Sequence, residues 1–75
     1  MRYPAGMPTV EEIQSLKGAD VAVRLTPSAG GQSVEGRVVG TLDAAYGLVV
    51  FIEPSGEPGE RLSYNYQHIA AIERR

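Results

Sequence analysis

Residues 36–52 read GRVVGTLDAAYGLVVFI, and this segment decides the fold class of the chain. Two apolar runs flank a short connection, DAAYG at 43–47, which predicts a tight hairpin. Gly36 and Gly40 lie inside the first strand, where glycines often mark a bend or a β-bulge. The second strand, 48–52, is apolar on both faces, as expected for a strand that is central or covered by another subunit. The segment therefore predicts a strongly bent hairpin of the kind that builds small barrels.

Alternating apolar residues on both sides of this hairpin predict further strands. Strand 21–25 comes before the hairpin, and strands 61–66 and 69–73 follow it. Turn-forming residues separate these strands, in a loop at 27–32 and an acidic loop at 54–59. The residues expected to share one face are Val21, Val23 and Leu25 in the first strand, and Val34, Val38 and Leu42 in strand 33–42. Five short strands with glycine bends indicate an all-β, antiparallel barrel.

A short helix is predicted in front of the strands, over residues 9–17. Thr9 and Glu12 have the spacing of a capping box, in which each side chain binds the backbone N–H of the other. Gly18 supplies a left-handed residue that ends the helix. The apolar stripe of this helix is Val10, Ile13 and Leu16. About two turns are too few to be stable alone, so we expect the helix to cap the open end of the barrel.

The composition narrows the possible functions. The 75 residues allow one domain, which we place at 9–75 after an irregular arm at 1–8. The absence of cysteine and the single histidine, His68, argue against disulfides, a metal site and a Cys–His nucleophile, so we predict no enzyme and no cofactor. A net charge of -2 lacks the basic footprint of a nonspecific nucleic-acid binder. The chain also lacks a membrane-spanning run of roughly 20 apolar residues and a signal-peptide core, which predicts a soluble, cytoplasmic protein without membrane contact.

Three segments, in this order, resemble the Sm-like (LSm/Hfq-like) family. GADVAVRL at 18–25 resembles the first strand of the family, which follows its N-terminal helix. Gly36 followed by DAAYGLVV at 43–50 is similar to the first Sm motif, and YQHIAAI at 66–72 resembles the second. The resemblance covers about residues 9–73, and the order and spacing of the segments support it more than any single motif. It implies a five-stranded, bent Sm/SH3-like barrel that forms a ring of subunits.

The resemblance also implies two sets of functional residues. Loop 43–47 and turn 65–68 would surround the pore of the ring and bind single-stranded RNA by stacking and hydrogen bonding. The candidate RNA-binding residues are Asp43, Tyr46, Gly47, Asn65, Gln67 and His68. The fourth predicted strand, 61–66, would pair with the fifth, 69–73, of the next subunit. This pairing would cover an apolar edge. The candidate interface residues are Leu62, Tyr64, Tyr66, Ile69 and Ile72.

The candidate nucleotide pocket departs from the pattern of the family. Gly47 stands where Sm proteins have a base-reading Asn, and Ala45 stands at the stacking position. Gln67 replaces the Lys of the Hfq-like motif, and Asn65 replaces the Arg of the other Sm motif. The interval from Gly36 to the aspartate of the motif has one residue more than usual, which a bulge would absorb. The pattern of the scaffold is therefore kept better than the nucleotide pocket.

Several candidate residues also have a structural interpretation, which the sequence leaves open. The structural interpretation of His68 is a turn whose histidine binds nearby backbone, and that of Asp43 is an Asx-turn that closes the hairpin. Tyr46 is either a base-stacking residue or part of the barrel rim. Tyr64 and Tyr66, two residues apart on strand four, are either a stacking platform or part of the core or subunit interface.

Two other classes of function fit the same barrel. Residues 48–73 are similar to the Rho-antagonist (Rof-like) family, an Sm-like barrel that binds a protein partner as a monomer. An acidic surface suits a basic protein partner in that case. The third possibility is a structural subunit, such as a phage assembly protein, that binds no ligand. The mass in solution separates the first two, because a ring is a homo-oligomer and the interaction module is a monomer.

Overall fold

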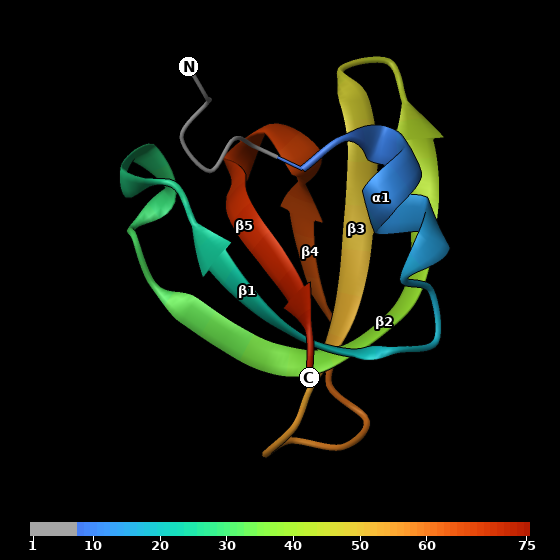
Figure 1. The fold of residues 1–75 in the computed structure, drawn as a ribbon, viewed down its shortest axis with the longest axis vertical. Helices are drawn as coiled ribbons and strands as arrows, with labels where there is room; N and C mark the ends of the chain where they lie inside the picture. Colours follow the sequence, from blue (N-terminus) through green and yellow to red (C-terminus); the bar gives the residue numbers. More distant parts are fainter. Residues whose placement is uncertain (1–7) are drawn as a thin grey trace.

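The computed structural model describes residues 8–75, so the arm predicted over 1–8 lies, apart from Pro8, outside the described residues. One antiparallel sheet of five strands forms the main body of the fold, with the strand order β4-β3-β2-β1-β5 (Figure 1). The prediction of a mostly β fold with a short N-terminal helix is confirmed. The elements are α1 (Val10–Ser15), β1 (Asp20–Leu25), the 3-10 helix η1 (Pro27–Ala29), β2 (Ser33–Ala44), β3 (Gly47–Pro54), β4 (Leu62–Asn65), the 3-10 helix η2 (Tyr66–His68) and β5 (Ile69–Arg74).

The helix α1 begins at the predicted capping box and ends earlier than expected. Thr9 Oγ1 accepts from the backbone N–H of Glu12 at 3.1 Å, and Glu12 Oε1 accepts from that of Thr9 at 2.9 Å. The helix ends at Ser15 because the chain then turns toward β2, where Gly18, at φ 84°, donates to the Val38 carbonyl at 2.7 Å. No helix within residues 8–75 has the length and apolar character needed to cross a membrane.

The strand β2 pairs with β1 through its first half and with β3 through its second half, and it curves strongly between them (Figure 1). A β-bulge lies between Val38 and Gly40, as the glycine pattern predicted. The bulge adds one residue, so the alternation of faces changes along the strand. Val38 is fully buried, whereas Leu42 is 56% exposed. The prediction that Leu42 shares a face with Val38 is therefore wrong, and Thr41 instead lies opposite the buried Val50.

The core lies on the inner face of the sheet and is entirely apolar. It contains residues from α1 and from every strand except β4. Its nine members are Ile13, Val21, Val23, Leu25, Val38, Leu48, Val50, Ile52 and Ile69. The predicted two-sided strand is confirmed as β3, which pairs on both sides and keeps Val49 and Phe51 half-buried on its outer face. The sheet and α1 therefore bury these nine side chains within one chain, whereas Val39, Leu42 and Tyr46 stay exposed.

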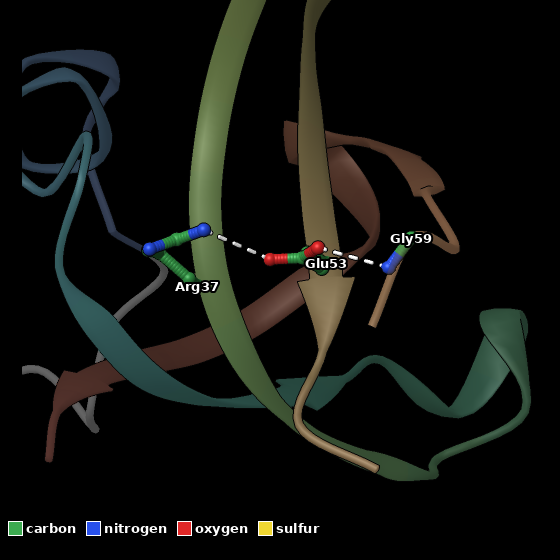
Figure 2. Close-up of polar contacts among 3 residues, drawn as sticks. All are labelled: Arg37, Glu53 and Gly59. Atoms are coloured by element: carbon green, nitrogen blue, oxygen red, sulfur yellow. Dashed lines mark hydrogen bonds and ion pairs between the residues drawn. The ribbon is translucent and has the colours of Figure 1, made fainter. Parts of the chain in front are cut away.

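The loop between β3 and β4 is attached to the sheet through Glu53. One carboxylate oxygen accepts from Arg37 Nη2 at 3.0 Å, and the other accepts from the backbone N–H of Gly59 at 3.0 Å (Figure 2). The hydrogen bond from Gly59 is the largest influence on the pKa of Glu53 and lowers it. The positive charges of Arg37 and Arg61 lower this pKa further, while burial acts in the opposite direction. An ionised Glu53 therefore keeps the exposed loop 55–61 folded back against β2 and β3.

Candidate functional site

The β2–β3 turn is a two-residue hairpin that exposes an aromatic ring. Ala44 pairs with Gly47, so that Ala45 and Tyr46 form the turn, and Gly47 has a φ of 125°. The Tyr46 side chain is 69% exposed. The tight connection predicted at 43–47 is confirmed, although Asp43 lies within β2, opposite Leu48, and is not part of the turn itself. The hairpin therefore presents Tyr46 to solvent at its tip.

Asn65 connects this hairpin to the turn between β4 and β5. Its Oδ1 accepts from the backbone N–H of Gln67 at 2.9 Å, which caps η2. Its Nδ2 donates to the backbone carbonyl of Tyr46 at 3.2 Å. The Asn65 side chain thus hydrogen-bonds to two turns, the β2–β3 turn and η2, which are far apart from each other in sequence. The structure brings together the two segments that resemble the two Sm motifs.

Gly47 packs directly against the second turn. A Cβ atom at this position would lie 3.3 Å from Tyr66 Cε1 and 3.5 Å from Asn65 Nδ2. The positive φ and the close contact both favour glycine here. Position 47 therefore has a structural reason to be glycine. A side chain at position 47 would be strained by the positive φ and would press on the Tyr66 ring.

Tyr66 does not continue β4, which corrects the prediction that Tyr64 and Tyr66 lie on one face of one strand. β4 ends at Asn65 because the Asn65 side chain caps η2, and Tyr66 is the first residue of that 3-10 helix. Both tyrosines are half-buried and pack against the core. They do not form an exposed stacking platform.

Gln67 and His68 complete η2, and both are exposed. The backbone carbonyl of His68 accepts from the backbone N–H of Thr26 at 2.9 Å, so η2 also contacts the loop after β1. Of the six candidate RNA-binding residues, Tyr46, Gly47 and Asn65 are in contact, and Gln67 and His68 follow directly in η2. Within residues 8–75, no hydrogen bond joins Asp43 to this group.

The charge of the candidate site is low. Asp43 is the only formally charged member of the set, and none of the six residues is Arg or Lys. The part of the chain that the structure describes contains no group of three side chains that could hold a metal ion. The site can therefore offer stacking on Tyr46 and hydrogen bonds from amide, imidazole and backbone groups.

The candidate interface residues divide between the core and the two edges of the sheet. β4 and β5 are the edge strands, and each pairs with only one neighbour. Leu62, Tyr64 and Ile72 are half-buried. Ile69 has no exposed area within a single chain, so its side chain belongs to the core and is not available to a partner.

Sequence reasoning missed a concave region on the outer face of β1, β2 and β5. It is a groove of about 420 Å³, and its lining includes Ala22, Arg24, Glu35, Ala71 and Glu73. The alternation in strand 21–25 showed that Ala22 and Arg24 share a face. No sequence signal showed which residues of the neighbouring strands lie beside them, because that depends on the register.

Comparisons with known proteins provide no relative for this site. No protein-family model matches the chain, and neither a curated protein nor a solved structure matches it significantly. The function is therefore inferred from the geometry of the site and from the motifs.

Proposed function

We propose that this chain is an Sm-like (LSm/Hfq-like) subunit with an Sm/SH3-like barrel fold, which assembles into a ring and binds single-stranded RNA. The observation that carries this proposal is the double hydrogen bonding of Asn65, which joins the Tyr46 turn to η2. In the Sm-like family, the corresponding two segments surround the pore. A chain that only needed to close the β2–β3 hairpin would not require a side chain from the β4–β5 connection to reach it.

The two edges of the sheet support assembly. β4 and β5 each leave one side without a strand neighbour, and η2 places them in direct succession along the chain. Unpaired edges promote pairing with another chain. Pairing of β4 with β5 of the next subunit would cover the half-buried Leu62, Tyr64 and Ile72. The same type of contact, repeated head to tail, closes a ring.

The RNA-binding chemistry follows from the groups at the site. Tyr46 offers an exposed ring on which an unpaired base can stack, a contact worth about 1–3 kcal/mol per base. The exposed Gln67 and His68 side chains supply hydrogen bonds to bases, ribose or phosphate. Because the site contains no Arg or Lys, few phosphate charges are neutralised, so affinity should depend weakly on salt. Such a subunit would act in the cytoplasm, where unpaired RNA is available.

Fluorescence anisotropy with labelled U-rich and A-rich oligomers at low salt tests the RNA-binding half of the proposal. We expect binding that Tyr46→Ala weakens about 5- to 150-fold, the equivalent of one lost stacking contact. Tyr46→Phe is the matched control, because it keeps the ring, and it should bind like the wild type. Absence of binding to both oligomers, or equal binding by the alanine and phenylalanine variants, would contradict the assignment.

A monomeric protein-interaction module is the second candidate, of the Rho-antagonist (Rof-like) type. The observation that favours it is the absence of Arg and Lys from the candidate site, together with a net charge of -2. These features suit a basic protein partner better than a phosphate backbone. A monomeric mass over the whole concentration range, with no RNA binding, would select this candidate over the ring.

A further inference from the structure

The outer face of β2, β1 and β5 has a regular pattern of small and charged residues. Ala22 of β1 pairs with Glu35 of β2 on one side and with Glu73 of β5 on the other. Arg24, two residues after Ala22 in β1, pairs with Ser33 of β2 and with Ala71 of β5. One row across the three strands therefore places a methyl group between two carboxylates. The next row places a guanidinium between two small side chains.

This pattern gives the face a projection and a hollow of opposite charge. Arg24 is exposed and is the only large side chain in its row. The hollow over Ala22 is part of the groove of about 420 Å³. The two rows are separated by two residues along a strand, about 7 Å. The carboxylates that flank the hollow are two strand spacings apart at their backbones, about 10 Å, which is wide enough to admit a guanidinium between them.

The charges of the face are balanced but only partly paired. Arg75 Nη1 lies 3.5 Å from Glu35 Oε1. Within residues 8–75, neither Arg24 nor Glu73 takes part in an ion pair. Among the residues that line the groove, Arg24 is therefore the one cation and Glu73 the one anion without an ion-pair partner, at neighbouring positions on adjacent strands. A partner that satisfies both must itself present an anion and a cation about 7 Å apart.

We propose that the partner is a second copy of this chain, packed face to face about a twofold axis that passes between Ala22 and Arg24. In this arrangement the Arg24 guanidinium of one copy enters the hollow between the partner's Glu35 and the partner's Glu73. The reciprocal contact forms at the same time, because a twofold interface uses the same surface on both copies. Each projection fills a hollow, and each unused charge gains a partner.

The chemistry of the contact suits an interface. Arginine forms bidentate, charge-assisted hydrogen bonds with carboxylates and is enriched at the centres of protein interfaces. The alanine methyl groups provide a flat apolar floor that the guanidinium plane can cover. The contact consists of two rows of three residues, whereas a standard interface has about 20–30 residues a side. We therefore expect a weak dimer that forms in the micromolar range and weakens as salt is added.

This twofold contact uses different groups from the proposed ring. It involves side chains on the outer face, whereas the ring uses the backbone edges of β4 and β5. The two contacts are compatible in principle, and either can exist without the other. The face-to-face contact does not rest on RNA binding.

Sedimentation velocity at a series of concentrations tests the proposal. Arg24→Glu places like charges in the hollow and should weaken face-to-face association at least about 30-fold. Glu73→Arg should also weaken it. A mixture of the two variants should associate again, because the arginine that remains at position 24 meets an unaltered hollow and the introduced glutamate meets the introduced arginine. Glu11→Arg reverses a charge on the exposed side of α1 and is the matched control, with wild-type association.

Each outcome decides one question. Unchanged association of Arg24→Glu, or failure of the mixture to associate while circular dichroism shows both variants folded, overturns the twofold contact. Binding of a lysine-rich peptide that is lost in Glu73→Arg, without any self-association of the wild type, overturns it in favour of a basic partner. The mass of the Arg24→Glu variant, measured without the other variant, tests the ring, because this substitution leaves the edges of β4 and β5 unchanged. A closed multiple of the subunit mass supports the ring, and a monomer contradicts it, whatever the result for the twofold contact.

Discussion

The strand β2 behaves differently before and after its bulge, and the two halves show how one inserted residue changes the role of a sequence pattern. In the first half, Gly36 and Val38 are buried and face the core. In the second half, Leu42 has the same even spacing but is exposed. The bulge between Val38 and Gly40 changes the parity of the pattern between the two halves. A period-two pattern therefore predicts the buried face only up to the next bulge.

The two glycines of β2 give the sharpest test of this comparison. A Cβ on Gly36 would lie 2.2 Å from the Glu53 carbonyl oxygen, whereas a Cβ on Gly40 would meet nothing within 4 Å. Gly36→Ala must separate β2 from β3 and should lower the free energy of unfolding by about 3 kcal/mol. Gly40→Ala should be neutral or raise it by up to about 1 kcal/mol. Urea unfolding of both variants measures the difference, and equal values would contradict the close approach of the two strands at Gly36.

A second test compares the two aliphatic side chains on either side of the bulge. Val38→Ala removes two methyl groups from the core and should lower the free energy of unfolding by about 2 kcal/mol. Leu42→Ala removes more atoms, yet it should change that free energy by less than about 0.5 kcal/mol because the side chain is exposed. Thermal unfolding followed by circular dichroism measures both. A larger loss at Leu42 would place the bulge elsewhere or show that a partner covers this side chain.

The smallest expected effect is a change in melting temperature. It concerns the outer face of the first half of β2, where Arg37 forms an ion pair with Glu53 of β3. The pKa of Glu53 is lower in the folded state than in the unfolded chain. The ionised side chain therefore stabilises the fold at pH values above its pKa in the unfolded chain, and this stabilisation is lost as the pH falls through its pKa in the folded state. Glu53→Gln should therefore lower the melting temperature slightly at pH 7 and have no effect in acid, where Glu53 is protonated. Glu57→Gln, in the same loop, is the control. A difference between wild type and Glu53→Gln that persists in acid would show that the loop does not depend on the charge of Glu53.

Local patterns predicted much of the fold. The Thr9–Glu12 capping box, the glycine-marked bulge and the turn at 43–47 all depend on residues close in sequence, and the structure contains each of them. The candidate site was predicted in part, since Tyr46 and Asn65 come together, although the motifs did not show that one side chain would join the two turns. Leu42 and Tyr66 were placed wrongly, because a bulge and a side-chain cap change the local geometry in ways that a period-two pattern does not contain.

The sequence by itself determined the helix, the order of the strands along the chain and the alternation within each strand, because these depend on backbone propensity and on side chains within a few residues of one another. Only the tertiary structure decided which residues lie side by side across strands. Cross-strand register placed Glu35 and Glu73 on either side of Ala22, and it placed Arg24 between Ser33 and Ala71. Register depends on hydrogen bonds between distant segments and on the position of each bulge, and no local pattern specifies it. The inner face and the turn of residues 36–52, the bent hairpin, could therefore be predicted in outline, but the charged outer face could not.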